Sequence, residues 1–138
     1  MNFVLRIGTK DFSCKTIHDF KQEIEYESIQ EGGRNDSVHI RPKPVTKPFT
    51  FQVERYVGSG FEDPLPTGRV LTDEIIVLVG ENPGDFGDPQ AEFTFRGCIV
   101  SGKSYSGLDS EKSGLIIETT TVAYEQMEVR WKDGKTAT

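Results

Sequence analysis

Apolar and polar residues alternate with a period of two over several long stretches of this chain. Between Phe49 and Val57 the apolar residues share one parity and the polar residues take the other. The same alternation runs from Ala91 to Val100 and, over the greatest length, from Leu115 to Trp131. Successive side chains of a strand point to opposite faces, so each segment is predicted to be a half-buried strand. The last segment is long enough that we expect a bend or bulge within it.

Two further segments complete the predicted elements. Val70–Val79 ends in a run that is apolar on both parities, which predicts the most buried strand, covered on both faces. Ile17–Glu27 fits a helix through Ile17, Phe20 and Ile24, but it also alternates, and we favour a strand. Turn-forming Gly and Pro clusters leave no room for several crossover helices. The pattern therefore predicts a mostly antiparallel β-sandwich or small barrel with at most one short helix.

Length and composition limit the class of protein. The 138 residues are 35% apolar and 28% charged, as expected of one globular domain spanning residues 1–138. The apolar runs are far shorter than a membrane span, and Met1–Lys10 lacks the apolar core of a signal peptide. Cys14 and Cys98 are predicted to be core-filling thiols rather than a disulfide framework. The net charge of −6 disfavours a duplex-DNA binder that acts by neutralising phosphates.

One motif suggests nucleotide chemistry. Residues Gly97 to Ser104 match the P-loop pattern G-x-x-x-x-G-K-[ST] letter for letter. A P-loop also needs a following helix whose N-terminus faces the phosphates, but the next segment is interrupted by Gly and Ser. Ile99 and Val100 suit a strand better than a phosphate-binding loop. We therefore interpret the match as a strand end and hairpin.

Other catalytic or cofactor sites have no support in the sequence. His18 and His39 are the only histidines, and neither has the spacing of a metal-ligand pair. The loop with Glu81, Asp85 and Asp88 lacks the alternating ligands of a calcium loop. No serine lies in a nucleophile elbow. We predict no catalytic residue, no metal and no cofactor.

Several blocks of the sequence are similar to the tail tube family of contractile-tailed phages and related contractile injection systems, including tailocins and Hcp-like tubes. The N-terminal block runs from Phe20 through Glu31-Gly32-Gly33-Arg34-Asn35-Asp36-Ser37-Val38-His39, and a strand follows at Phe49–Val57. The C-terminal blocks are Phe93–Cys98, Tyr105–Asp109, Gly114–Thr119 and Ala123–Glu125. The likeness covers Phe3 to Trp131. The chain departs from the family between Gly58 and Arg69, where a Pro-rich segment stands in place of a helix, and at Gly97, where Asn is common.

The resemblance implies a structural subunit, not an enzyme. Such subunits form hexameric rings that join their sheets into an inner β-barrel and stack into a hollow tube, with sheath, baseplate and terminator proteins as partners. DNA or protein cargo passes through the lumen without sequence-specific binding, and no membrane span is needed. The subunit would be made in the bacterial cytoplasm and assembled into a virion tail or injection particle.

Candidate contact residues follow from these blocks. Adjacent glycines and polar groups in the loop predict contacts between subunits or rings. These contacts are assigned to Glu31, Gly32, Gly33, Arg34, Asn35, Asp36, His39, Leu108 and Asp109. Glu23, Glu25 and Glu27 share one strand parity, and on a lumen face their charge would repel DNA phosphates or keep protein cargo from adhering.

Three alternatives stay open beside the repeating tube subunit. One is a baseplate tube-initiator, and another is an effector-carrying or adhesive β-sandwich that binds a partner through a ring or an unpaired edge. The third is a small nucleotide-dependent enzyme, which rests on the match at Gly97 to Ser104 alone.

Overall fold

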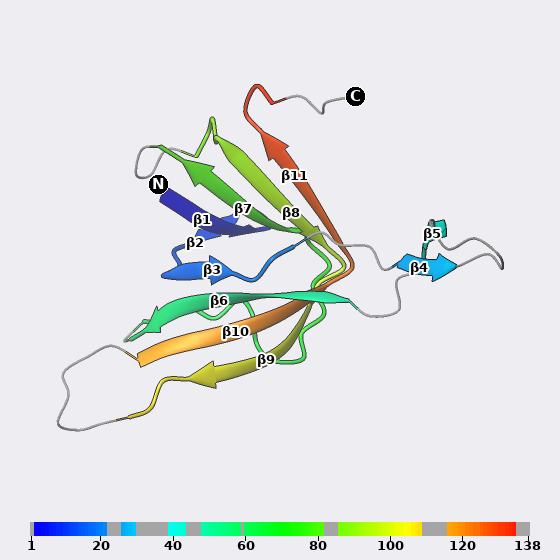
Figure 1. Ribbon diagram of the computed structural model, residues 1–138. Coiled ribbons are helices and arrows are strands. Elements are labelled where there is room, and N and C mark those ends of the chain that lie inside the picture. The colour runs from blue at the N-terminus through cyan, green and yellow to red at the C-terminus, as the bar shows by residue number, and fades with distance from the viewer. Residues whose placement is uncertain are drawn as a thin grey trace.

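The computed structural model shows two antiparallel sheets that face each other, meet near one end and diverge toward the other (Figure 1). The structure describes residues 2–21, 26–29, 39–43, 48–58, 60–81, 86–108 and 116–134. Within these ranges every regular element is a strand, and no helix is present. The predicted antiparallel β-sandwich is confirmed.

The first sheet has five strands. In spatial order they are β11 (Gln126–Trp131), β8 (Ala91–Arg96), β7 (Ile75–Gly80), β1 (Asn2–Ile7) and β2 (Lys10–Phe12). β7 lies in the middle, which confirms the prediction of a strongly buried strand at the apolar run. That strand begins at Ile75 rather than at Val70, which makes only an isolated bridge to Ile99.

The second sheet has four strands. In spatial order they are β3 (Thr16–His18), β6 (Phe49–Val57), β10 (Ile116–Tyr124) and β9 (Ile99–Tyr105). β6 follows the predicted bounds, and nine residues of β10 pair with it. The register between β9 and β10 shifts at Thr121/Val122, where Ser101 is left as the extra residue of a bulge.

Two of the predicted segments each contain two strands instead of one. The segment 91–100 is divided between β8 and β9 because Gly97, with φ +67°, turns the chain. The segment 115–131 bends at Glu125, so that β10 belongs to one sheet and β11 to the other. The expected bend is confirmed, and it is the corner at which the chain crosses between the sheets.

The prediction of one strand from Ile17 to Glu27 is wrong. β3 ends at His18, and Asp19 adopts a positive φ of 69° that turns the chain out of the sheet. β4 (Tyr26–Ile29) then pairs with β5 (His39–Pro42) in a separate two-stranded sheet. This hairpin arm projects from the sandwich (Figure 1). Alternation revealed strand character at both ends of the segment but not the turn between them.

Aromatic rings from both sheets fill the space between them. Phe51 stacks on Phe95 at a centroid distance of 4.2 Å, and Tyr124 meets Phe95 edge-on at 4.9 Å. All three are buried together with Leu5 and Leu65. Stacking of this kind adds about 0.5–1.5 kcal/mol per pair to the gain from burial. The core thus joins the two sheets and the loop that carries Leu65.

Both cysteines are free thiols in the interior. Cys98 is buried and Cys14 is half-buried. Burial raises the pKa of each thiol to about 11. They are therefore protonated and poor nucleophiles near neutral pH, as the prediction of core-filling thiols requires.

No helix in the described part of the chain is long and apolar enough to cross a membrane.

Candidate functional site: strand edges, a buried ion network and an apolar cleft

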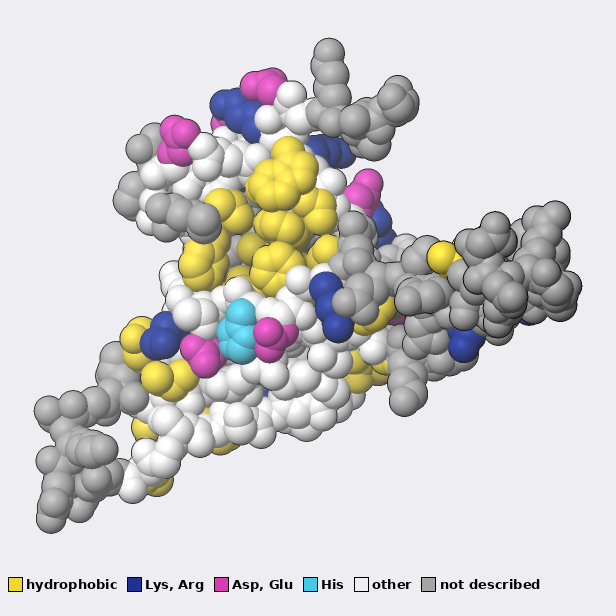
Figure 2. Space-filling view, in the orientation of Figure 1, with side chains coloured by type: hydrophobic (Ala, Val, Ile, Leu, Met, Phe, Trp, Pro, Cys, Tyr) yellow, Lys and Arg dark blue, Asp and Glu magenta, His cyan; other side chains and the backbone are white. Residues whose placement is uncertain are grey.

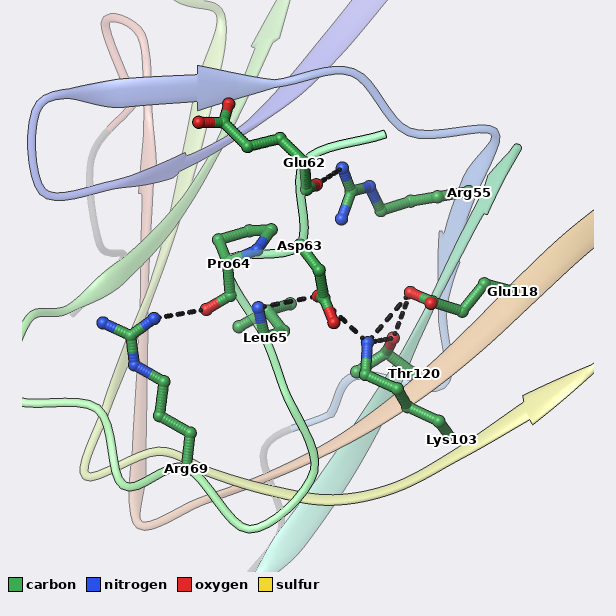
Figure 3. A network of polar contacts seen from close by, with 9 residues as sticks. All are labelled: Arg55, Glu62, Asp63, Pro64, Leu65, Arg69, Lys103, Glu118 and Thr120. Atoms are coloured by element: carbon green, nitrogen blue, oxygen red, sulfur yellow. Dashed lines mark hydrogen bonds and ion pairs between the residues drawn. The ribbon is translucent and has the colours of Figure 1, made fainter. Parts of the chain in front are cut away.

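A buried ion network attaches the loop after β6 to the four-stranded sheet (Figure 3). Lys103 on β9 has a side chain only 8% exposed, and its Nζ lies 2.9 Å from Glu118 Oε1 and 3.1 Å from Asp63 Oδ1. Nζ also donates to the hydroxyl of buried Thr120. Asp63 Oδ1 in turn accepts from the backbone N–H of Leu65, which places Leu65 in the core. The network fixes the Pro-rich loop without any helix.

Arg55 forms the other end of this attachment. Its guanidinium lies 4.3 Å from the centroid of Phe61 and 5.6 Å from that of Phe12, and Nη2 donates to the Glu62 carbonyl at 2.7 Å. The residue is buried, and cation–π contacts of this kind contribute more when they are shielded from water. Arg55 is thus a structural clamp on the same loop.

The P-loop match is a strand and not a phosphate-binding loop. Ile99–Tyr105 is β9, and Lys103, at the position of a phosphate-binding lysine, points into the sandwich and pairs with two carboxylates. The segment that follows, 106–108, is not helical. The interpretation as a strand end and hairpin is confirmed, and the nucleotide-binding hypothesis loses its only motif.

One long strand edge is open. The segment 66–71 covers the edge of β9 near its start, since Gly68 and Arg69 exchange backbone hydrogen bonds with Val100, and Leu71 donates to Cys98. Among the described residues no strand pairs with Ser101–Tyr105 on the side away from β10. This stretch presents no exposed charged side chain, because Lys103 is buried in the ion network. Unpaired strand edges without charges are templates for another strand.

The opposite edge of the same sheet is β3. β3 hydrogen-bonds only to β6 among the described strands, through Thr16, Ile17 and His18. The Thr16 hydroxyl donates to Glu54 Oε2 at 2.6 Å, and this bond, followed by the charge of Lys15, lowers the pKa of Glu54. The free edge of β3 is therefore short but firmly held.

The edges of the five-stranded sheet carry charges. β2 exposes Lys10 and Asp11, and β11 exposes Glu128 and Arg130. Charged side chains of this kind are a common protection against strand addition. The two sheets thus differ in how open their edges are to pairing.

The two outward faces differ in chemistry as well. On the five-stranded sheet, Arg96 pairs with Glu74 at 2.7 Å and with Glu128 at 3.0 Å, and Arg6 pairs with Asp11. The outward face of the four-stranded sheet is rich in hydroxyl groups, and its charges gather at the β3 side, where Glu54 pairs with Lys15 and lies 3.9 Å from His18. Its members include Thr16, Thr50, Gln52, Thr119, Thr121 and Ser104.

An apolar cleft opens where the two sheets diverge (Figure 2). One wall is a cross-strand row on the five-stranded sheet, in which Phe3, Val79, Ala91 and Trp131 stand side by side. β3 and the residues after it form the other wall. The cleft has a volume of about 360 Å³ and is lined by Phe3, Thr16, Ile17, Phe20, Val77, Val79, Ala91, Phe93 and Trp131. Trp131 is 60% exposed at its rim, 5.8 Å from the Phe93 ring centroid.

Comparison with known proteins gives fold likenesses only. No protein-family model and no curated protein sequence matches this chain. A chain of the PVC extracellular contractile injection system, from its sheath-tube complex in the extended state, superposes with a TM-score of 0.78 at 9% identity, over 94% of this chain and 88% of that one. A chain of the anti-feeding prophage baseplate gives 0.76 at 14% identity, over 94% and 93%. Hcp1 from Flavobacterium johnsoniae gives 0.55 at 15% identity, over 94% of both chains.

This chain has the Hcp-like β-sandwich fold. The likeness runs over nearly the whole chain, which confirms at the level of fold the resemblance that the sequence motifs indicated. In this Hcp-like sandwich the Pro-rich residues 60–69 form a loop without a helix, and Arg55 and Lys103 attach it to the four-stranded sheet.

Of the predicted contact residues, only His39 and Leu108 are among the described residues. His39 lies at the start of β5, on the hairpin arm, and Leu108 is 81% exposed after β9. The remaining contact residues, Glu31, Gly32, Gly33, Arg34, Asn35, Asp36 and Asp109, lie outside the described residues. Of the candidate lumen residues, Glu23 and Glu25 also lie outside them, and Glu27 is in β4 of the arm rather than in either sheet of the sandwich.

Sequence reasoning missed the apolar cleft and the open edge of β9. Trp131 was included in an alternating strand, but alternation does not reveal that part of a strand's inner face extends beyond the opposing sheet. The open edge could be found only from the pairing order, since Ser101–Tyr105 contains few apolar residues.

Proposed function

We propose that this chain is a structural subunit of the inner tube of a contractile injection system or contractile phage tail. Its copies form hexameric rings that stack into a hollow tube for DNA or protein cargo, with sheath, baseplate and terminator proteins as partners. The observation that carries this proposal is the superposition on the sheath-tube and baseplate chains over 94% of this chain. The subunit is synthesised in the bacterial cytoplasm before assembly.

The shape of the molecule supports an assembly role. The two strands of its hairpin arm form a sheet only with each other among the described strands, and a two-stranded hairpin alone is marginally stable in water. An arm of this kind gains stability when it packs on a neighbouring copy. We assign the contacts between rings to the arm and its loop, Glu31 to Asp36 with His39, and further contacts to Leu108 and Asp109. Glu23, Glu25 and Glu27 are proposed to contribute acidic charge to the lumen.

A structural role also fits the polar residues of the interior. The lysine of the P-loop match is buried in ion pairs, and of the two thiols Cys98 is buried and Cys14 is half-buried. Three or more metal-ligating side chains do not come together anywhere in the described part of the chain. We therefore propose that the chain is not an enzyme and takes no cofactor.

Negative-stain electron microscopy of the purified, untagged protein, at low and raised concentration, tests the proposal. Six-fold rings or hollow filaments are the expected result, because the open edge and the arm favour contacts between identical copies. Monomers at every concentration, also after addition of preformed tube ends of the same particle, would contradict it.

A second candidate function is a baseplate tube-initiator, and the specific observation in its favour is the likeness to the anti-feeding prophage baseplate chain. The same micrographs separate the two. A repeating subunit forms filaments whose length increases with concentration, whereas an initiator forms single rings or short stacks.

A further inference from the structure

The buried ion network holds one amine against two carboxylates, which is the arrangement of a reactive site. We propose that Lys103 Nζ forms an amide bond with the carboxyl carbon of Asp63 after folding, with Glu118 as the proton carrier and water as the product. The proposal goes beyond the tube function, because the bond forms within one copy and does not depend on assembly.

The two reacting groups are already in contact. Nζ lies 3.1 Å from Asp63 Oδ1, and the carboxyl carbon that it would attack is bonded to that oxygen. Lys103 and Asp63 are 40 positions apart in the sequence, so only the fold brings them together. Groups held in contact react as if each were present at a very high concentration, about 10⁵ M or more where they are well oriented. Folding thus lowers the entropic barrier that separates a free amine from a free carboxyl group.

Glu118 is placed to activate the amine. Its side chain is 2% exposed, and Oε1 accepts a hydrogen bond from Nζ at 2.9 Å. Burial disfavours charged groups, so transfer of one proton along this bond, which leaves a neutral amine and a neutral acid, costs less than it does in water. Thr120 holds the pair in place, since its hydroxyl accepts from Nζ at 3.2 Å and donates to Oε1 at 3.1 Å.

Asp63 is oriented as the acceptor, and it approaches Nζ from a different side than Glu118 does (Figure 3). Its Oδ1 accepts a hydrogen bond from the backbone N–H of Leu65 at 3.0 Å, and this donor stabilises the charge that develops on the oxygen during attack. The next residue is Pro64, which has no backbone N–H. The competing loss of water at an aspartate, closure on the following backbone nitrogen, is therefore blocked. The side chain is 32% exposed, so the released water can leave.

The atoms and charges balance without an outside reagent. One proton moves from Nζ to Glu118 and on to Asp63 Oδ2, and the lone pair of Nζ then attacks the Asp63 carboxyl carbon. A C–N bond forms, Glu118 takes a second proton from the nitrogen and delivers it to Oδ2, and the C–Oδ2 bond breaks with release of water. Nζ keeps its last proton as an amide N–H, and Glu118 ends as the carboxylate it was at the start. The product joins the Pro-rich loop to β9 covalently.

Intact mass under denaturing conditions tests the bond on the natural protein. Chains of full mass still hold the ion network, and the share of chains lighter by one water molecule should increase with time after folding. Tryptic digestion should then yield a branched peptide in which Tyr56–Arg69 is joined to Gly97–Lys112, because trypsin does not cleave after an acylated Lys103. Protein kept unfolded in guanidinium chloride for the same time should show neither change.

Two variants that each lose one carboxylate isolate the role of Glu118. Glu118→Gln keeps the shape of the side chain and leaves Asp63 beside Nζ, but it cannot carry a proton, so the branched peptide should form about a hundredfold more slowly. Glu62→Gln removes the neighbouring carboxylate of the loop, whose pair with Lys10 is about two-thirds exposed, and should cross-link like the natural protein. Circular dichroism checks that both variants are folded.

Three results would overturn the proposal. They are a folded natural protein that keeps its full mass through prolonged incubation, a loss of water located outside the pair of Asp63 and Lys103, and a Glu118→Gln variant that cross-links as fast as the natural protein. None of them bears on the tube function, which electron microscopy tests separately.

Discussion

At the scale of single residues, the interior of this sandwich depends on charge pairing as well as on apolar packing. Glu118 is 2% exposed, and its carboxylate accepts from Lys103 and Thr120. Lys103→Met should lower the free energy of unfolding by about 3–5 kcal/mol, because it leaves the Glu118 carboxylate buried without a counter-charge. Urea unfolding of the purified protein measures this loss.

Two controls connect that loss to the buried charge. The double variant Lys103→Met with Glu118→Gln should recover most of the stability, because no charge is then buried alone. Lys10→Met breaks only the pair with Glu62, in which both side chains are about two-thirds exposed, so it should cost less than about 1 kcal/mol. If Lys103→Met were as mild as Lys10→Met, the network would not be what attaches the loop to the sheet.

At the scale of elements, alternation in the sequence predicted the strands but not where they end or where they pair. β6 was predictable over its full length because Phe51 and Val53 face the core while Gln52 and Glu54 face outward. The parity of the inward-facing residues changes at both turns, from Phe95 to Val100 across Gly97 and from Tyr124 to Met127 across Glu125. Apolar residues on the outward face, such as Ile99 and Ala123, continue the apolar parity through each turn and hide the change in the sequence. Pairing order is a long-range property, and the open edge and the cleft follow from it.

The hairpin arm is an element whose contribution to stability should be separate from that of the sandwich. Its two strands form a separate sheet and pair with no other described strand. Gly32→Leu, in the segment between the two strands of the arm, should therefore change the thermal midpoint by less than about 2 °C, because neither of these strands belongs to the two sheets that enclose the core. The same change should stop the stacking of rings into filaments, seen by electron microscopy. Asp36→Leu should act alike, and normal filaments from both variants would contradict the assignment of ring contacts to this loop.

At the scale of the whole molecule, assembly has to overcome repulsion between like-charged copies. Each copy carries a net charge of −6, while the open edge of β9 exposes no charged side chain and the cleft is apolar. Screening weakens the repulsion but hardly affects backbone hydrogen bonds or apolar burial, so ring formation should increase from about 20 mM to about 300 mM NaCl. Sulfate should favour it more than chloride at equal ionic strength, because sulfate strengthens apolar burial. Sedimentation velocity measures both effects. Had the copies instead been joined through the charged edges of β2 and β11, added salt would dissociate them, so the sign of the salt dependence distinguishes the two junctions.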